Sequence, residues 1–431
     1  IILDDPTTDL DPISKQEVMD ILYELKNEIE IDVPGTDEKS KMTFLVIEHE
    51  LTDLMEFTDR VMVMHEGKII LNGRPGEIFY ENYDYLNDIG VRIPDHIRLA
   101  KYLMDRGLSY DKVKYPVKRE DVIDFAREAI CNNAISFQPI EYRDYTIKGK
   151  EKVAEIKNLS FKYPTLDKMT LKNINFDIYK GEFFAIVGHN GSGKSTLMKN
   201  LLGILQPTEG EVIINGQNTK KTDISKLILD IGYVFQNPDN QLFCDTVREE
   251  IEFGLKNNKY PQEEIDKLTN RALDIVGLKE RQKEHPFSLS RGQRQRLAVA
   301  TMLVSNPKII MLDEPTTGLD EVDLQGILKL MQELIDLHDG TLIMVTHDME
   351  VVAKYATRVI VIDDGQVVLN DNPDRVFKNN VDKLESLKLK PTIISSITTK
   401  LADIGMPYAP YWSFFEEHII NRTKDMDSKA I

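Results

Sequence analysis

The chain has 431 residues, and its 54 Lys and Arg against 72 Asp and Glu give a formal net charge of −18. With 41% hydrophobic and 29% charged residues, the composition is that of a soluble globular protein, too apolar for intrinsic disorder and too charged for a membrane channel. The net negative charge argues against a protein whose main function is to bind the phosphate backbone of nucleic acids. Two cysteines, Cys131 and Cys244, are too few for a disulfide scaffold or a thiolate metal site and favour a cytosolic compartment.

The first predicted element is a strand that ends in two acids, within ILDDPTTDLD (Ile2 to Asp11). The segment recurs as MLDEPTTGLD (Met311 to Asp320), at an offset of 313 − 4 = 309. Because the chain begins with Ile1 rather than Met, inside this strand, we expect a fragment.

A second repeat follows, in which residues 46–79 align without a gap to residues 344–377 at an offset of 298. The alignment matches His49 to His347 and Gly67 to Gly365. The two offsets differ by 309 − 298 = 11, so the first copy holds 11 extra residues, which the polar stretch from Asp32 to Lys41 would carry as a loop. The repeats predict two tandem copies of one domain, the first of them incomplete.

The repeats divide the chain into four predicted segments. Residues 1–90 would be the C-terminal part of the first domain, 91–152 a linker with an accessory helix, 153–380 a complete second domain and 381–431 a C-terminal helical extension. Within the linker, REDVIDFAREAI (Arg119 to Ile130) has apolar residues at helical spacing.

The segment FFAIVGHNGSGKST (Phe183 to Thr196) predicts a strand, a glycine-rich loop and a helix that continues to Leu205. The loop fits G-x-x-x-x-G-K-[ST], in which backbone N–H groups converge on phosphate oxygens at a helix N-terminus. Lys194 would neutralise the β- and γ-phosphates, and Ser195 would bind Mg²⁺. A coincidental glycine-rich turn is the alternative, and the matching strand and helix weaken it.

Two further segments carry candidate functional residues. KIIMLDEP (Lys308 to Pro315) predicts a buried parallel strand whose end delivers Asp313 toward Mg²⁺ and Glu314 toward an attacking water. An acidic turn that merely closes the strand is the alternative. In FSLSRGQRQRL, Ser290 followed by Gln293 is a capping-box pattern that opens a helix, which Pro307 would end.

Taken together, GHNGSGKST, FQNPDNQLF, LSRGQ, IIMLDEP, TTGLD and GTLIMVTH resemble, in this order, the nucleotide-binding domain of ATP-binding cassette (ABC) proteins. The resemblance covers residues 153–377 as a complete domain and 1–79 as a partial one. It implies an α/β P-loop NTPase fold with an inserted helical subdomain that carries LSRGQ. It also implies ATP and Mg²⁺ as ligands, ATP hydrolysis as the reaction, and head-to-tail pairing with another ABC domain.

The same resemblance assigns roles to particular residues. The expected catalytic residues are Glu314, His347 and Gln236, and the expected Mg²⁺ ligands are Ser195, Gln236 and Asp313. ATP would be bound by Tyr163, through its ring on adenine, and by Gly188, His189, Asn190, Gly191, Ser192, Gly193, Lys194, Ser195 and Thr196. A signature of Ser290, Arg291, Gly292 and Gln293 would act in trans, with Asp320 as the D-loop acid and Arg291 replacing a usual glycine. In the first copy, Asp4, Asp5, Asp11 and His49 would form a degenerate site, because Asp5 is one methylene shorter than the expected glutamate. Ordinary packing is the alternative for Tyr163 and for His347.

Within the ABC family, FQNPDNQLF (Phe235 to Phe243), two cassettes in one chain and the short tails resemble the ATPase of energy-coupling-factor importers, which take up vitamins and transition-metal ions. The resemblance implies an integral membrane coupling protein and a substrate-capturing membrane protein as partners, a peripheral place on the cytoplasmic face of the membrane, and no nucleic acid. PYWSFFEEHII (Pro410 to Ile420) would help the cassettes pair, or would pack into the core.

Three rival classes compete with this interpretation. A non-catalytic scaffold is disfavoured, because Lys194, Gln236, Glu314 and His347 are all present. Chromosome-maintenance ATPases are excluded, because only 289 − 193 = 96 residues separate Gly193 from Leu289. A soluble tandem-cassette ATPase that acts on the ribosome stays open as the alternative, although the predicted linker is mixed in charge rather than basic.

Overall fold

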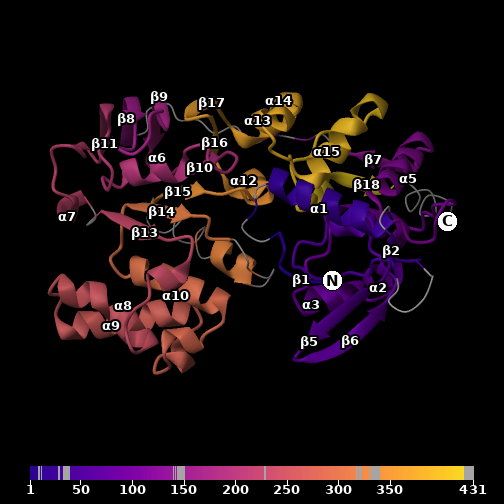
Figure 1. Cartoon of the computed structure of the whole chain (residues 1–431), viewed down its shortest axis with the longest axis horizontal. Coiled ribbons are helices and arrows are strands. Elements are labelled where there is room, and N and C mark those ends of the chain that lie inside the picture. The colour runs from indigo at the N-terminus through magenta and orange to yellow at the C-terminus, as the bar shows by residue number, and fades with distance from the viewer. Residues whose placement is uncertain are drawn as a thin grey trace, which may run out of the picture. The chain divides into compact units, whose positions relative to one another are not determined.

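The computed structural model in Figure 1 describes the chain except for residues 8–9, 11, 28–29, 33–38, 139, 141, 143–150, 228–229, 317–318, 320–322, 330, 332–339 and 422–431. The chain folds into two compact units, which we call unit 1 (Ile1–Arg143 with Phe377–Ile431) and unit 2 (Asp144–Val376). The boundaries predicted from the repeats remain a prediction. By packing, the predicted linker and the C-terminal extension largely fall in the same unit as the first copy.

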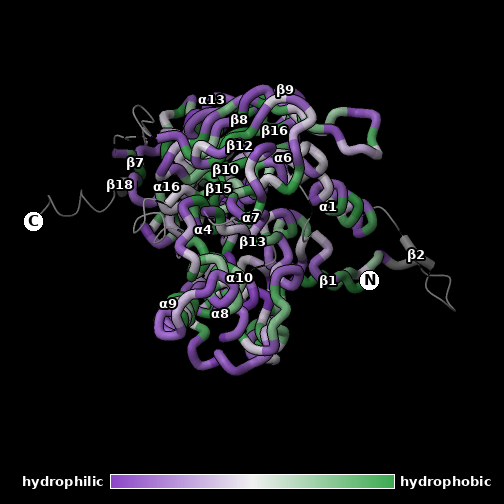
Figure 2. Tube along the Cα trace, turned by 90° about the vertical axis from the view of Figure 1, so that its left-hand side faces the viewer, coloured by the Kyte–Doolittle hydropathy of each residue, from purple (hydrophilic) through white to green (hydrophobic). Residues whose placement is uncertain are grey.

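Unit 2 is built on a six-stranded sheet in the order β13-β14-β15-β10-β16-β17. All pairs are parallel except β16 with β17. Every residue of β10, β14 and β15 is buried, and Figure 2 shows the hydrophobic character of β10 and β15. The strands are β10 (Phe183–Val187), β13 (Ile231–Val234), β14 (Ile309–Asp313), β15 (Thr341–Val345), β16 (Arg358–Asp363) and β17 (Gln366–Asp371).

A second, antiparallel sheet of unit 2 has the order β12-β11-β8-β9, and α6 contacts both this sheet and the parallel one. Its strands are β8 (Lys152–Phe161), β9 (Leu171–Tyr179), β11 (Glu209–Ile214) and β12 (Gln217–Asn218). The remaining elements are α6 (Lys194–Leu201), α7 (Ile224–Leu227), η2 (Pro238–Asn240), α8 (Val247–Asn257), α9 (Gln262–Ile275), η3 (Lys279–Arg281), η4 (Pro286–Ser288), α10 (Arg291–Leu303) and α12 (Met349–Tyr355), while α13 (Pro373–Asn379) crosses the boundary between the units. In the sequence, α8, α9 and α10 lie between β13 and β14, and these helices pack together. The predicted α/β P-loop fold with an inserted helical subdomain is therefore confirmed.

Local signals position α10 and α6. The Ser290 side chain accepts from the Gln293 N–H at 3.2 Å and the Gln293 side chain accepts from the Ser290 N–H at 3.0 Å, so the predicted capping box forms. The α10 helix ends at Leu303, before Pro307. The α6 helix ends at Leu201 rather than Leu205, because Gly203 takes a left-handed φ of 73° that ends the helix.

Unit 1 contains two small sheets whose register matches unit 2. In the parallel pair β1 (Ile2–Asp4) and β4 (Leu45–Ile47), Leu3 faces Val46, as Leu312 faces Met344 in unit 2. In the hairpin of β5 (Val61–His65) and β6 (Lys68–Gly73), the register shift falls at the position where β16 and β17 also shift. The sequence offsets of 309 and 298 are thus reproduced by strand pairing.

The extra residues of the first copy include a short hairpin, because β2 (Glu30–Asp32) pairs antiparallel with β3 (Lys39–Lys41). The sequence predicts only a loop from Asp32 to Lys41, and residues 33–38 lie outside the described residues. The other elements of this part of unit 1 are α1 (Pro12–Asn27), η1 (Leu54–Glu56), α2 (Pro75–Glu81) and α3 (Tyr83–Asp88).

The rest of unit 1 is a helical body made from two distant parts of the chain. The helices α4 (Asp95–Asp105) and α5 (Arg119–Cys131) pack with each other, and α4 also contacts α15 (Ile393–Lys400) and α16 (Trp412–His418). Strand β7 (Ile135–Phe137) pairs with β18 (Ile419–Asn421), and α14 (Val381–Ser386) and η5 (Ala402–Ile404) complete the unit. The packing alternative for this aromatic segment concerned Trp412 and Phe414: Trp412 is buried in this core, and Phe414 is half-buried against it. The predicted helix in the linker is confirmed as α5.

No helix in the described ranges is long and apolar enough to cross a lipid bilayer.

Candidate functional site

The glycine-rich loop of unit 2 joins β10 to α6, as the sequence predicts. Gly191 and Gly193 have left-handed φ values of 81° and 110°, and Gly193 is the N-cap residue of α6. A Cβ atom on Gly188 would collide with the Ile362 carbonyl oxygen and with Ser192 Oγ. The loop therefore needs its glycines to bring backbone N–H groups together at the helix N-terminus.

The side chains of this loop fit an anionic phosphate chain. Lys194 Nζ donates to the Gly188 and His189 carbonyl oxygens at 2.7 and 3.0 Å, which holds a buried ammonium inside the loop. Ser192 Oγ is buried and has no hydrogen-bond partner within the described structure. Ser195, Asn190 and Gly191 are exposed. An unsatisfied buried hydroxyl beside a buried cation indicates a site that a ligand completes.

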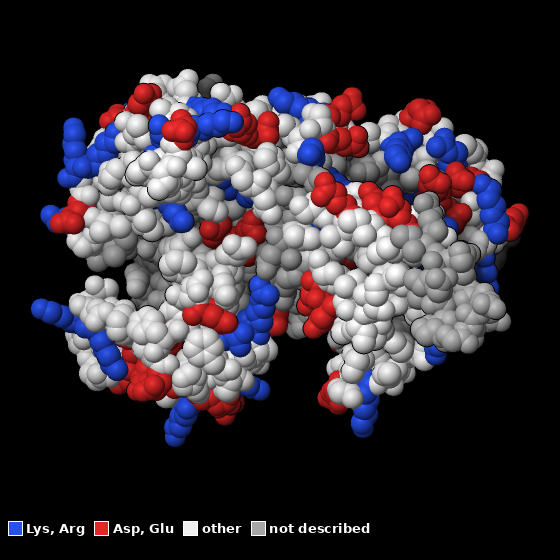
Figure 3. All heavy atoms as spheres, in the orientation of Figure 1, with Lys and Arg blue, Asp and Glu red and all other residues white. Residues whose placement is uncertain are grey.

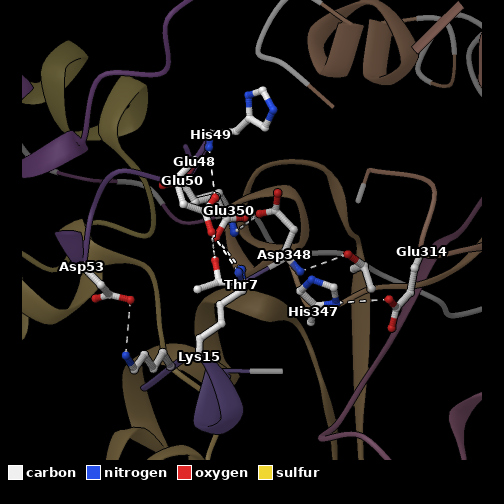
Figure 4. Close-up of polar contacts among 12 residues, drawn as sticks. Thr7, Lys15, Glu48, His49, Glu50, Asp53, Glu314, His347, Asp348 and Glu350 are labelled. Carbon is white, nitrogen blue, oxygen red and sulfur yellow. Dashed lines mark hydrogen bonds and ion pairs between the residues drawn. The ribbon is translucent and has the colours of Figure 1, made fainter. Parts of the chain in front are cut away.

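Two carboxylates stand at the C-terminal end of β14. Glu314 has a φ of 47° and its N–H donates to the Val345 carbonyl oxygen at 2.8 Å, so the backbone turns sharply after Asp313. His347 Nδ1 lies 3.3 Å from Glu314 Oε2, and Gln236 Nε2 donates to the same oxygen at 3.3 Å (Figure 4 shows the His347 contact). The structure thus brings together the three residues expected to be catalytic.

The environment shifts the pKa values of the two acids in opposite directions. Burial, followed by the charge of Glu314, raises the pKa of Asp313, to which Tyr233 donates a hydrogen bond at 3.3 Å. Burial alone would also raise the pKa of Glu314, but the hydrogen bond and charge of His347, together with Lys194, outweigh it and lower that pKa. Two neighbouring carboxyl groups whose pKa values are shifted in opposite directions are typical of sites that transfer protons.

A magnesium ion would find suitable oxygen ligands near the loop. Ser195 is exposed in the first turn of α6, and the charge of Lys194 acts on Asp313 as well as on Glu314. No group of three or more His, Cys, Asp or Glu side chains in the described parts of the chain is arranged to hold a metal by itself. Ser195 and Asp313 are oxygen donors of the kind that could share a Mg²⁺ ion with substrate phosphates.

Tyr163 lies close to the loop, since its hydroxyl is 3.3 Å from Thr196 Oγ1 in α6. Its ring packs edge-on against Phe161, with 4.9 Å between the ring centroids. The ring is half-buried, so one part of its surface is open to a ligand.

The signature residues form the first turn of α10. Ser290 is exposed at the N-cap, whereas Gly292 is buried against Asp323, whose carboxylate leaves no room for a Cβ atom there. Asp323 also pairs with Arg296 of the same helix. The glycine is therefore required for packing, while Ser290, Arg291 and Gln293 stay at the surface. Asp320, the expected D-loop acid, and Asp11 of the expected first-copy site lie outside the described residues.

The first-copy residues form a weaker version of the acid–histidine pair. Asp5 Oδ2 is 3.7 Å from His49 Nε2, and the two side chains are 37% and 51% exposed. Asp4 ends β1, as Asp313 ends β14. Glu48 accepts hydrogen bonds from the N–H groups of Thr7 and His49 (Figure 4).

Sequence reasoning missed two residues that hold the site together. Tyr233 bonds to Asp313, and Asp363 Oδ1 lies 3.0 Å from His189 Nε2 of the loop. Neither belongs to a motif, because each acts through a contact between distant strands. An acid at the end of a strand next to β10 would have been a weak signal for Asp363.

Comparison with known proteins identifies the family. The ABC transporter family profile matches residues 171–317. A Methanosarcina mazei protein, provisionally named an ABC transporter ATP-binding protein, is 37% identical over 414 residues, which are 94% of this chain and 67% of that protein. A protein of Caldanaerobacter subterraneus with the same provisional name is 36% identical over 408 residues, 93% of this chain and 68% of that protein. The chain belongs to the family of ABC transporter ATP-binding proteins and spans about two thirds of the length of these relatives.

A solved structure agrees with this assignment. The cbiO1 protein of Clostridium perfringens, described as part of the ABC transporter complex cbiONQ, is 36% identical, has a TM-score of 0.50, and covers 56% of this chain and 98% of its own. The fold, the family match and the site together define an ATP-binding enzyme that hydrolyses ATP.

Proposed function

We propose that the chain is the ATP-hydrolysing subunit of a membrane importer of the energy-coupling-factor type, which takes up a vitamin or a transition-metal ion. The similarity to cbiO1, itself part of the complex cbiONQ, supports this proposal. The two copies in one chain and the FQNPDNQLF motif agree with it. The location that follows is the cytoplasmic face of the membrane, where the protein would be peripheral.

The structural observation that carries the proposal is an exposed aromatic patch in the segment that follows Gln236, formed by Phe243 and Phe253. These side chains are 64% and 43% exposed, and their rings meet edge to face with 4.7 Å between the centroids. Phe235, next to Gln236 in the sequence, is 41% exposed. Exposed aromatic clusters mark interaction sites. Because Gln236 bonds to Glu314, a membrane coupling protein seated on this patch would press on the segment that reaches the hydrolytic site.

The chemistry we assign to the site is attack of water on the γ-phosphate of ATP, with release of ADP and phosphate. Lys194 and the loop N–H groups would bind the phosphates, and Tyr163 would stack on the adenine. Mg²⁺, held by Ser195, Gln236 and Asp313, would neutralise charge on the β- and γ-phosphates. Glu314 would accept the proton of the attacking water.

Two other elements would complete the reaction. His347 keeps Glu314 oriented and ionised and would contact the γ-phosphate. Ser290 and Gly292, at the positive end of α10, would meet the γ-phosphate of a second ABC domain packed head to tail.

The test is affinity purification of the tagged full-length protein from its native membranes, followed by mass spectrometry. We expect a small multi-span coupling protein and a substrate-capturing membrane protein in the eluate. The double substitution Phe243→Ser with Phe253→Ser should lose both, whereas Ile204→Ser, at an exposed apolar residue outside the patch, should keep them. An intact complex with the double variant would remove the patch from the proposal.

A soluble ATPase that acts on the ribosome is the second candidate. On the face shown in Figure 3, the described Lys and Arg side chains alternate with Asp and Glu and form no continuous basic stripe. Such a distribution does not favour binding to RNA phosphates. Recovery of ribosomes without a membrane partner would replace the importer proposal with this one.

A further inference from the structure

The glycine-rich loop of unit 2 is fastened to the turn between β16 and β17. The Gly365 N–H donates to the Ser192 carbonyl oxygen at 3.0 Å, and the Gly188 Cα packs tightly against the Ile362 carbonyl. His189 adds a side-chain link, because its Nε2 lies 3.0 Å from Asp363 Oδ1. The turn thus acts as a support behind the phosphate-binding backbone.

The second ring nitrogen of His189 is also engaged. Its Nδ1 lies 2.7 Å from the carbonyl oxygen of Asn190, the next residue of the loop. A carbonyl oxygen and a carboxylate oxygen can only accept hydrogen bonds, so each ring nitrogen can bond to its partner only by donating. A neutral imidazole has one N–H, so both contacts are hydrogen bonds at the same time only when the ring carries two protons.

The Asn190 carbonyl matters because of the peptide group to which it belongs. A phosphate-binding loop works when its N–H groups face the ligand, and a carbonyl turned inward would repel the phosphates. A hydrogen bond from His189 Nδ1 to this carbonyl oxygen holds the peptide group between Asn190 and Gly191 in one orientation before a ligand binds. The Nε2–H group in turn ties the ring to Asp363.

We propose that His189, held by Asp363, is a positioning residue that pre-organises the glycine-rich loop for ATP and makes ATP affinity depend on pH. This inference rests on the proposed phosphate site. Preorganisation lowers the cost of binding, because the loop does not have to be ordered when the ligand arrives. A doubly protonated ring would also carry a positive charge within the phosphate-binding loop.

The charges around the ring agree with this role. Asp363 faces Nε2, and the neighbouring Asp364 is neutralised by Lys172 at 2.5 Å. On the loop side, Lys194 is the neighbouring cation, and its Nζ donates to the Gly188 and His189 carbonyl oxygens. Loss of the proton from His189 would therefore remove one of two donors and the charge that pairs with Asp363.

The first copy provides an internal contrast. At the offset of 298, the position of Asp363 is occupied by His65, at the end of β5. His65 is exposed and cannot supply an anionic acceptor. The link between His189 and Asp363 therefore has no counterpart at His65. His65→Gln is a matched control, because it changes a histidine on the corresponding turn.

The test is calorimetric binding of β,γ-imido-ATP with Mg²⁺ to the full chain and to His189→Gln, Asp363→Ala, their double variant and His65→Gln. We expect both single variants to bind about three- to tenfold more weakly near pH 6, and the double variant to bind like either single one. Near pH 9 the wild type should lose its advantage and the ratio should fall to about one, because the neutral ring has one donor. His65→Gln should bind like the wild type at both pH values.

Several results would overturn the proposal. Equal affinities of the wild type and His189→Gln near pH 6, a ratio that does not change with pH, or losses that add in the double variant would each do so. If His189→Gln fails to fold by circular dichroism, Asp363→Ala tests the same link from a half-exposed residue. Lys194→Ala separates the two levels of inference: wild-type affinity in that variant would refute the phosphate site itself, whereas lost binding there, with unchanged His189 variants, would refute only the role of His189.

Discussion

The acid after β14 and the acid after β1 occupy the same backbone position in two different surroundings. Glu314 and Asp5 have φ values of 47° and 44°, and their N–H groups donate to equivalent carbonyl oxygens at 2.8 and 2.9 Å. The side-chain pairs differ, because Glu314 and His347 are 11% and 16% exposed at 3.3 Å, whereas Asp5 and His49 are 37% and 51% exposed at 3.7 Å.

This contrast shows that strand pairing and the surroundings of the acid are set by different parts of the fold. Parallel pairing of β1 with β4 is enough to reproduce the turn and the positive φ. The surroundings depend on further elements of unit 2, where Gln236 donates to Glu314 and the charge of Lys194 helps to lower the pKa of Glu314.

The largest effect is expected for loss of the buried acid. Glu314→Gln keeps the shape of the side chain but removes the proton acceptor, so ATP hydrolysis should fall by about 10²- to 10⁴-fold. Asp5→Asn should change the rate by less than about twofold, because its exposed, longer contact orients water poorly. Steady-state phosphate release from the full-length protein measures both, and comparable losses from the two substitutions would refute the asymmetry.

A second prediction concerns stability rather than catalysis. His96 of unit 1 is fully buried, and burial lowers its pKa to about 4 although Nε2 bonds to the Val117 carbonyl. The unfolded chain takes up this proton near pH 6.5 and the folded unit only near pH 4, so unit 1 is fully stabilised above about pH 6.5 and loses about 3 kcal/mol as the pH falls to about 4.

Hydrogen exchange on peptides of α4 measures this loss against pH. His96→Leu should remove the part of the pH dependence that His96 causes, while His65→Gln, at an exposed histidine, should keep it. An unchanged pH profile in His96→Leu would assign the acid sensitivity of unit 1 to its carboxylates instead.

The smallest effect separates two glycines at equivalent turns. Gly67 and Gly365 have φ values of 76° and 75°, but a Cβ atom on Gly67 would meet open space, whereas one on Gly365 would collide with the Thr170 carbonyl oxygen. Gly67→Ala should cost about 1 kcal/mol of backbone strain, and Gly365→Ala about 1–3 kcal/mol more, because the loop support must move. Urea denaturation, together with hydrogen exchange in each hairpin, compares the two variants. Equal losses of unfolding free energy would mean that backbone strain alone explains both effects.

The parts of the fold that depend on neighbours in sequence could be predicted. The apolar runs gave β10, β14 and β15, and helical spacing gave α5 within one residue at its C-terminal end. The capping box at Ser290 forms because both partners lie three residues apart. The resemblance to ABC proteins predicted that Gln236, Glu314 and His347 belong to one site, and these side chains do meet.

Other features could not be predicted because they join distant residues. The segment expected as a linker contributes α4 and α5 to a core shared with α15 and α16, about 300 residues later in the chain. The β2–β3 hairpin appeared where the turn-forming residues predicted only a loop. Composition and hydrophobic periodicity indicate that a helix buries one face, but they do not identify the element against which that face packs.

By itself, the sequence determined the family, the phosphate-binding loop, the repeat and its register, since these follow from glycine positions, apolar periods and matching segments. The tertiary structure alone decided which of two equivalent acids is buried and that His189 meets Asp363 across 174 residues. The physical reason is range: turns and caps depend on hydrogen bonds within a few residues, whereas burial and charge pairing arise when strands distant in sequence pack side by side.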